Sequence, residues 1–167
     1  KILITGATGF LGRELVSALA SGDNNNIFCL IRNNHQKKLF PSKNIKYIIG
    51  DITDKNLVNL VPKNIDTVFH LAAVQRSSNY ELSYSVNVLG TKNIVNVMKQ
   101  TGAKKIIFTS SVNVYLKHKG VYAKTKIQAE KVIEEANIPA LVLRPALIYG
   151  PRDPVFTKIL KHVNFSF

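Results

Sequence analysis

Short apolar runs alternate with longer amphipathic stretches along this chain of 167 residues. Six runs rich in β-branched residues are typical of strands, and they cover residues 1–5, 26–32, 45–50, 66–72, 104–110 and 140–145. Their apolar residues follow one another rather than alternate, which favours parallel strands buried on both faces. The pattern therefore predicts an α/β fold with helices between the strands of a parallel sheet.

In three of the intervening stretches, apolar residues repeat at helical spacing. The apolar positions are Leu11, Leu15, Val16 and Leu19, then Val86, Leu89, Ile94 and Val97, then Ala129, Val132, Ile133 and Ala136. Turn residues at 22–23, 102 and 137–139 end these predicted helices.

Composition is that of a globular protein with a packed core. The chain is 46% hydrophobic, its mean hydropathy is +0.03, and its length fits one domain. No apolar run approaches the ~20 residues of a membrane helix, and no signal-peptide order opens the chain. We expect a cytoplasmic protein with no membrane partner.

Cysteine and histidine positions give no sign of a disulfide or a metal centre. Cys29 is the single cysteine, and the apolar run around it indicates a buried role. His35, His70, His118 and His162 are scattered along the chain, so no metal site is expected.

The charge is strongly basic, with 23 Lys and Arg against 10 Asp and Glu and a formal net charge of +13. Such a balance suits anionic partners such as phosphates or nucleic acid. The basic residues are nevertheless spread out, without interleaved aromatics or a nucleic-acid motif. We interpret them as solvated surface residues and expect no nucleic-acid partner.

The stretch "TGATGFLG" (5–12) places three glycines between the first predicted strand and the first predicted helix. Gly6 would make the turn, Gly9 would let the backbone approach a pyrophosphate, and Gly12 would pack the helix closely on the strand. The anion would lie at the helix N-terminus. Such glycines can also form a turn alone, but the strand and helix around them favour a phosphate site.

Further motifs follow in order: "GDI" (50–52), "HLAA" (70–73), "NVLGT" (87–91), "TSSVNVY" (109–115), "YAKTK" (122–126) and "RPALIYGP" (144–151). With the glycine stretch, they resemble the extended short-chain dehydrogenase/reductase superfamily, which includes NAD(P)-dependent epimerases and dehydratases of nucleotide sugars and related reductases.

The resemblance implies a Rossmann-like, doubly wound parallel sheet with strand order 3-2-1-4-5-6. Residues 1–150 would form the NAD(P)-binding Rossmann domain, and residues 151–167 would begin a truncated substrate-binding region. The last residues, 157–167, are interpreted as a helix leading into something longer, so the C-terminal substrate domain would be largely absent.

The resemblance also implies a set of cofactor-binding residues. Asp51 and Ile52 would contact adenine, 71–73 would line the pyrophosphate and ribose, and Pro145 would lie beside the nicotinamide amide. The whole set is Gly6, Thr8, Gly9, Phe10, Leu11, Gly12, Arg32, Asp51, Ile52, Leu71, Ala72, Ala73, Tyr122, Lys126 and Pro145.

Four residues are candidates for catalysis. Tyr122 and Lys126 are four apart on a predicted helix and share a face. An adjacent ammonium and an oxidised nicotinamide would favour the phenolate of Tyr122, whose reference pKa is near ~10, so Tyr122 is a candidate general acid/base. By resemblance, Ser111 would hold the substrate oxygen, Lys126 would also bond the nicotinamide ribose, and Asn87 would position that lysine or a water.

Arg32 ends the second predicted strand, where a carboxylate would bind the ribose 2′-hydroxyl of NAD and an arginine would suit the 2′-phosphate of NADP. We therefore favour NADP(H) over NAD(H). The alternative is that Arg32 caps a strand edge or stacks on adenine.

Only ten residues separate Ser111 from Tyr122, whereas sugar-nucleotide epimerases usually carry a long substrate-contacting loop there. The chain could therefore belong to an epimerase, a dehydratase or a ketone reductase. Its substrate would be a nucleotide sugar or a related hydroxyl or carbonyl compound. A non-catalytic NADP-binding regulator and a basic scaffold protein are the alternatives; the presence of Ser111, Tyr122 and Lys126 favours an enzyme. A homodimer contact through 80–100 and 121–136 would use Tyr80, Leu82, Tyr84 and Val97, which could also be core.

Overall fold

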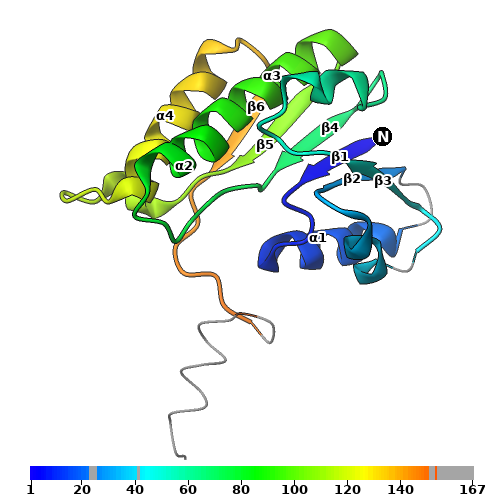
Figure 1. Cartoon of the computed structure of the whole chain (residues 1–167), viewed down its shortest axis with the longest axis horizontal. Helices are drawn as coiled ribbons and strands as arrows, with labels where there is room; N and C mark the ends of the chain where they lie inside the picture. Colours follow the sequence, from blue (N-terminus) through cyan, green and yellow to red (C-terminus); the bar gives the residue numbers. More distant parts are fainter. Residues whose placement is uncertain (23–25, 41, 151–152, 154–167) are drawn as a thin grey trace, which may run out of the picture.

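The central feature of the computed structural model is a six-stranded parallel sheet with the order β3-β2-β1-β4-β5-β6 (Figure 1). The structure describes residues 1–22, 26–40, 42–150 and 153. The strands are β1 (Ile2–Thr5), β2 (Ile27–Ile31), β3 (Ile45–Ile49), β4 (Thr67–His70), β5 (Lys105–Thr109) and β6 (Ala140–Leu143). Both the six strands and their order are confirmed. The expected helix over 157–167 and the expected substrate region at 151–167, apart from Asp153, lie outside the described residues.

Helices cover the two faces of the sheet unequally. Helix α1 (Phe10–Ala20) lies on one face beside β1 and β2, and α3 (Gly90–Thr101) and α4 (Val121–Glu135) lie on the other (Figure 1). Short helices complete the described chain: η1 (Asn34–Leu39), η2 (Lys55–Asn59), α2 (Tyr80–Tyr84), the π-helical η3 (Ser85–Leu89) and η4 (Val112–Tyr115).

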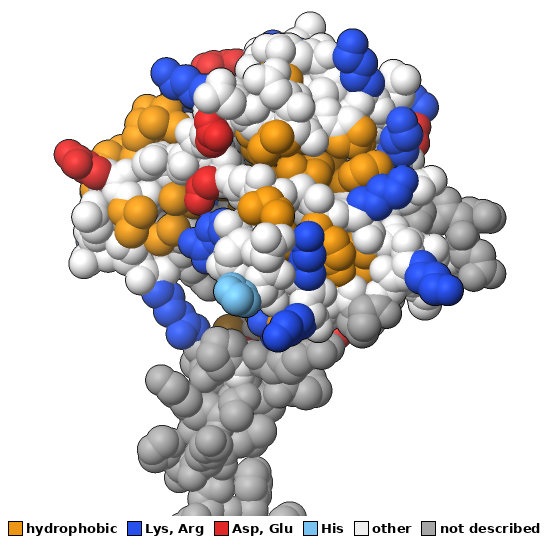
Figure 2. Space-filling view, turned by 45° about the vertical axis from the view of Figure 1, so that its right-hand side comes forward, with side chains coloured by type: hydrophobic (Ala, Val, Ile, Leu, Met, Phe, Trp, Pro, Cys, Tyr) orange, Lys and Arg blue, Asp and Glu red, His pale blue; other side chains and the backbone are white. Residues whose placement is uncertain are grey.

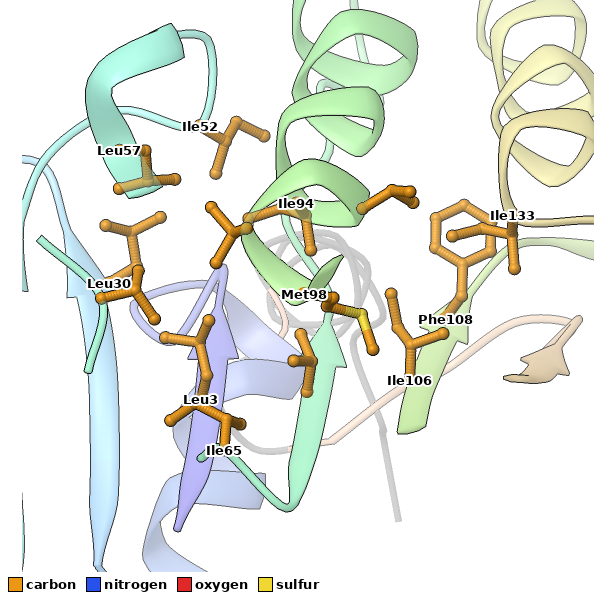
Figure 3. Close-up of a cluster of buried hydrophobic side chains, with 14 of the residues drawn as sticks. Leu3, Leu30, Ile52, Leu57, Ile65, Ile94, Met98, Ile106, Phe108 and Ile133 are labelled. Carbon is orange, nitrogen blue, oxygen red and sulfur yellow. The ribbon is translucent and has the colours of Figure 1, made fainter. Parts of the chain in front are cut away.

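The larger core layer fills the space between the sheet and helices α3 and α4 (Figure 3). Leu3, Ile106 and Phe108 rise from the strands to meet Ile94 and Ile133 from the helices. A smaller cluster on the α1 face is built from Ile4, Ala7, Val16, Ile27, Cys29, Ile31, Phe40 and Ile45. Cys29 is fully buried there, and burial raises its thiol pKa to about 12, which agrees with its expected apolar role.

The expectation that every strand is buried on both faces is wrong for β6. Leu141 is 53% exposed and Leu143 is 44% exposed, while Val142 between them packs against the α3–α4 core. Side chains alternate across a strand, so Leu141 and Leu143 point to the α1 face. Among the described elements, α1 covers only the β1–β2 part of that face, and edge strand β6 stays uncovered.

The spread of basic side chains agrees with the sequence analysis, and the four candidate dimer residues differ in their burial. Figure 2 shows lysines and arginines dispersed among apolar and neutral groups on the face that it presents. Of the four residues considered for a dimer contact, Val97 is core, Tyr84 is half-buried, and Tyr80 and Leu82 are exposed. No helix in the described part of the chain is long and apolar enough to cross a membrane.

Glycine at position 12 is required by packing between backbone segments. A Cβ on Gly12 would lie 2.1 Å from the Gly6 carbonyl oxygen and 2.8 Å from Ala7 Cα, whereas a Cβ on Gly120 would meet nothing within 4 Å. We expect Gly12→Ala to lower the free energy of unfolding by at least about 2 kcal/mol, because backbone must move apart. Gly120→Ala, at the N-cap of α4, should change it by less than about 1 kcal/mol. Urea unfolding of both variants tests this, and equal losses would contradict it.

Candidate active site

The candidate site lies at the carboxyl ends of the parallel strands, where the chain order reverses between β1 and its two neighbours, β2 and β4. Open α/β sheets form their ligand crevice at such a switch point. Two adjoining cavities of about 270 and 510 Å³ open there, and they share Gly6, Gly9, Leu71 and Ala73.

The first cavity brings together predicted residues from four strand ends. These are Gly6, Thr8, Gly9, Arg32, Asp51, Ile52, Leu71, Ala72 and Ala73. Its other lining residues, which the sequence reasoning missed, are Leu30, Ile31, Gly50, Val74 and Val86. Most of these residues adjoin predicted residues in the sequence. The predicted strand ends could therefore have been used to identify them as lining residues.

The glycine turn has the geometry of an anion cradle. Gly6 has a φ of +70°, and a Cβ on it would lie 2.6 Å from Ala72 N, so only glycine lets this turn pass over the end of β4. Gly9 is the N-cap of α1, and no side chain caps the helix there. The first N–H groups of α1 are therefore available to a ligand. Arg13 Nε donates to the Thr8 carbonyl at 3.0 Å and braces the turn.

Asp51, which follows β3, and Arg32, which follows β2, both line this cavity at the adenine end predicted for it. Asp51 Oδ1 accepts hydrogen bonds from Thr53 N at 2.9 Å and Thr53 Oγ1 at 2.8 Å, which fixes the carboxylate. The backbone N–H of Arg32 donates to Gln36 Oε1 at 2.8 Å, and the side chain is exposed. An exposed arginine side chain thus belongs to the lining of the cavity.

The second cavity is lined by six further residues of the predicted site. Phe10, Leu11 and Gly12 come from the start of α1, and Ser111, Tyr122 and Pro145 come from the opposite side. Gln75, Arg76, Thr109, Ser110, Ala146, Leu147, Ile148 and Asp153 line it as well and were not predicted. Two hydroxyl-bearing side chains of the predicted catalytic set therefore meet one space.

Ser111 lines that space and keeps its hydroxyl proton available for a ligand. Its Oγ accepts the N–H of Asn113 at 3.2 Å and caps η4, so the hydroxyl proton stays available. Backbone bonds from Ser110 N to Leu143 O at 2.6 Å and from Val112 N to Pro145 O at 3.1 Å hold this segment beside the end of β6.

Tyr122 lies in the first turn of α4, and burial raises the pKa of its phenol. The expectation that the Lys126 ammonium favours the phenolate is therefore not met by the chain alone. The Lys126 Nζ lies over the Phe108 ring, 3.9 Å from its centroid, and no hydrogen bond joins it to Tyr122 within the described residues. Burial therefore favours the neutral phenol of Tyr122.

Lys126 is 1% exposed, and burial lowers the pKa of its ammonium to about 7, against the opposing effect of the Glu130 carboxylate. In the part of the chain that the structure describes, its Nζ makes no hydrogen bond with protein. A buried amine with unused donors fits a ligand that carries hydroxyl groups, which a dinucleotide ribose supplies. Neither Lys126 nor Asn87 lines a cavity directly; both lie beneath it.

Asn87 is fully engaged by protein. Its Oδ1 accepts from Val74 N at 2.8 Å, and its Nδ2 donates to Val74 O at 3.0 Å and to Thr125 Oγ1 at 2.9 Å. No hydrogen bond joins it to Lys126 among the described residues, so its predicted influence on that lysine stays a prediction. The amide instead ties the Val74 loop to α4.

Glu130 and Arg144 form a second tie between α4 and the sheet. Arg144 Nε and Nη2 donate to the two Glu130 oxygens at 2.9 and 2.8 Å, and this pairing lowers the pKa of Glu130 against the effect of burial. Because Pro145 follows Arg144, the pair holds the Pro145 wall of the cavity at a fixed distance from the Tyr122 helix.

Sequence reasoning also missed a group of buried polar side chains beneath the cavities: Thr5, His70, Thr91 and Thr125. A histidine and a threonine inside apolar strand runs were the available signal. The described residues contain no group of three His, Cys, Asp or Glu side chains close enough together to hold a metal ion.

Comparison with known proteins agrees with this arrangement. The model of the NAD dependent epimerase/dehydratase family matches residues 2–165. The chain belongs to this family.

Two curated members of the family illustrate its range. The human sterol-4-alpha-carboxylate 3-dehydrogenase, decarboxylating, is 33% identical over 183 residues, which cover 96% of this chain and 48% of that protein. The N-acetyl-alpha-D-glucosaminyl-diphospho-ditrans,octacis-undecaprenol 4-epimerase of Escherichia coli O157:H7 is 34% identical, covering 92% of this chain and 50% of that protein. The chain thus spans about half the length of these relatives.

A solved structure of the family, MoeE5 in complex with UDP-glucose and NAD, superposes with a TM-score of 0.77 at 27% identity. The match covers 96% of this chain and 59% of that one. The alignment with the human dehydrogenase is 183 positions long, which is more than the 167 residues of this chain, so the relative has insertions within the aligned region.

Burial of Lys126 should lower the stability of the fold. Lys126→Met removes a buried ammonium while keeping much of the volume, so we expect the free energy of unfolding at pH 6 to rise by at least about 1 kcal/mol. The folded pKa of about 7 lies below the ordinary value of 10.5, so the destabilisation is complete below pH 7 and disappears as pH rises toward 10.5. The stability gained by Lys126→Met should therefore decrease as the pH rises from about 7 toward 10.5.

Urea unfolding between pH 6 and pH 10 measures this gain, with exposed Lys124→Met as the matched control. A destabilised Lys126→Met protein at pH 6 would show that the ammonium is stabilised, and the interpretation would be wrong.

Proposed function

We propose that this chain is the dinucleotide-binding part of an NAD(P)-dependent oxidoreductase or epimerase of the extended short-chain dehydrogenase/reductase type. One observation carries the proposal: the glycine turn and the Ser111 and Tyr122 hydroxyls face adjoining cavities, above a buried Lys126 with unused donors. A diphosphate at the turn would leave the nicotinamide end of the cofactor beside those hydroxyls.

The residues of the first cavity would hold the cofactor's adenosine and diphosphate. The free N–H groups at the start of α1 suit the diphosphate, with Thr8, Phe10 and Leu11 beside it. Adenine would lie against Ile52, near the exposed Asp51 carboxylate. Lys126, which lines neither cavity, would donate to the ribose hydroxyls from its buried position, and Pro145 in the second cavity would lie along the nicotinamide amide.

The bound nicotinamide supplies the chemistry of hydride transfer with a substrate carbon. The chain's own part is control of the substrate oxygen. Ser111 donates a hydrogen bond to that oxygen through its unused hydroxyl proton, and Tyr122, held as a phenol by burial, gives its proton to the oxygen when a ketone is reduced. In the oxidation of a secondary hydroxyl, Tyr122 would act as the phenolate and accept the hydroxyl proton, while hydride would pass to the oxidised nicotinamide and Ser111 would stay bonded to the substrate oxygen.

The substrate class that fits is a secondary hydroxyl or a ketone. The relatives named above act on a sterol carboxylate and on a polyprenyl diphospho-sugar, and MoeE5 binds UDP-glucose with NAD. We therefore propose nucleotide sugars and 3-hydroxysterols as the first probes.

Replacement of Tyr122 tests the catalytic role. Turnover of the whole protein should fall about 10²- to 10⁴-fold in Tyr122→Phe, because the proton donor is lost while the ring stays. The dissociation constant for the dinucleotide, from calorimetry, should change less than about twofold. Tyr115→Phe, at a side chain that is 70% exposed, is the control.

Full turnover in Tyr122→Phe would remove this residue from the mechanism. A wild-type protein that binds NAD or NADP but turns over no probe would instead favour the non-catalytic regulator.

Replacement of Arg32 tests the proposed preference for NADP(H). The guanidinium faces the first cavity from the end of β2, where it would pair with a 2′-phosphate. We expect Arg32→Asp to reduce the affinity ratio of NADP to NAD by about tenfold or more. Lys38→Asp, an equal charge change at an exposed site of η1, should leave the ratio unchanged. An unaltered ratio in Arg32→Asp would mean that Arg32 does not recognise the phosphate.

A further inference from the structure

A buried imidazole joins the two halves of the proposed site. His70, the last residue of β4, is 1% exposed, and both of its ring nitrogens bond threonine hydroxyls. Nδ1 lies 2.6 Å from Thr5 Oγ1, and Nε2 lies 2.9 Å from Thr91 Oγ1. Thr5 immediately precedes Gly6 of the turn, and Thr91 lies on α3.

The number of protons on each hydroxyl and ring nitrogen determines which atom donates in each of these hydrogen bonds. Thr91 Oγ1 donates its single proton to the Asn87 carbonyl at 2.6 Å, so it accepts from His70. His70 Nε2 therefore carries a proton. Burial lowers the pKa of His70 to about 3, and the charge of Lys126 acts in the same direction, so the ring is neutral and Nδ1 accepts from Thr5.

The chain of bonds continues at both ends. On one side, Thr5 Oγ1 accepts the N–H of Ala72 at 3.3 Å, next to the glycine turn. On the other, Asn87 donates through Nδ2 to Thr125 Oγ1 at 2.9 Å, and that hydroxyl lies 3.0 Å from the Tyr122 carbonyl in the first turn of α4.

A neutral ring also suits its neighbours. The His70 ring lies 5.5 Å from the Phe108 ring, and the Lys126 ammonium lies over Phe108. Among described residues, Lys126 is the titratable group whose charge acts on His70. An imidazolium here would repel the ammonium that the proposed function requires.

We propose that His70, as the neutral Nε2–H tautomer, is a positioning residue that holds the dinucleotide-binding turn in register with the helix that carries Tyr122 and Lys126. This inference rests on the proposed function. It predicts that the hydroxyl of Thr91, which lines neither cavity, affects dinucleotide binding through His70.

Thr91→Val removes that hydroxyl at nearly constant volume, and the chain offers a matched control. Thr101 is also buried on α3 and also donates to the carbonyl four residues before it, at 2.7 Å to Val97 O, but it does not contact His70. We expect Thr91→Val to weaken NADP or NAD binding by fivefold or more in calorimetry, because coupled positions act through shared contacts. Thr101→Val should lose similar stability in urea and keep wild-type affinity.

The dependence on His70 is tested in the same assay. In a His70→Phe background, Thr91→Val should have no further effect on affinity. If His70→Phe does not fold, the Thr5→Val and Thr91→Val pair replaces it, and the double variant should lose less affinity than the product of the two single losses.

Long-range ¹H–¹⁵N spectra of the His70 ring report which ring nitrogen carries the proton. A residue that only filled space would not require one particular tautomer. We expect an unprotonated Nδ1 and a protonated Nε2 throughout the pH range in which the wild type stays folded. Equal affinity in Thr91→Val and Thr101→Val, or a protonated Nδ1, would overturn the positioning role. A wild-type chain that binds neither dinucleotide would overturn the proposed function itself.

Discussion

The approach of the Gly6 turn to the end of β4 is the constraint on which the site depends. With φ at +70° and no Cβ, Gly6 lets the chain leave β1 directly over Leu71 and Ala72. The contact between Gly12 and the Gly6 carbonyl then fixes where α1 begins. Because all six strands are parallel, the ends of β5 and β6 bring Ser111 and Pro145 to the same edge. The start of α1 and the residues Ser111 and Tyr122 therefore line the same cavity.

Much of this arrangement is encoded locally and could be predicted from the sequence. A run such as Ile27–Ile31 has few alternatives to a buried strand, and glycines between a strand and a helix have few alternatives to a tight turn. Five of the six strands end one or two residues before the predicted boundary, because flanking residues such as Arg32 leave the ladder for the cavity, and β1 ends at Thr5 as predicted. The motifs then place most predicted site residues on the two cavities without any knowledge of their distances.

The rest depends on neighbours that are distant in sequence. Leu141 and Leu143 have the composition of a buried strand, but an edge position leaves them exposed. Leu89, one of the apolar positions at helical spacing, is 40% exposed at the end of the π-helical turn η3, which the spacing did not predict. His70 looks like an interruption of an apolar run, and its partners lie 65 and 21 positions away. Satisfaction of a buried polar group cannot be judged before those partners are known.

Lys126 is a buried ammonium that the surrounding polar groups leave without a direct salt bridge. An ammonium at 1% exposure is costly unless it is paired, and a direct salt bridge would occupy the donors that a ribose needs. The fold avoids that outcome, because both oxygens of Glu130, the nearest acid along the helix, are taken by Arg144 at 2.9 and 2.8 Å. The face of Phe108 and the long-range field of Glu130 partly offset the burial, and neutral His70 adds no opposing charge. The amine is thus kept close to its titration point with its donors unused, a state that lowers stability and suits a ligand with hydroxyl groups.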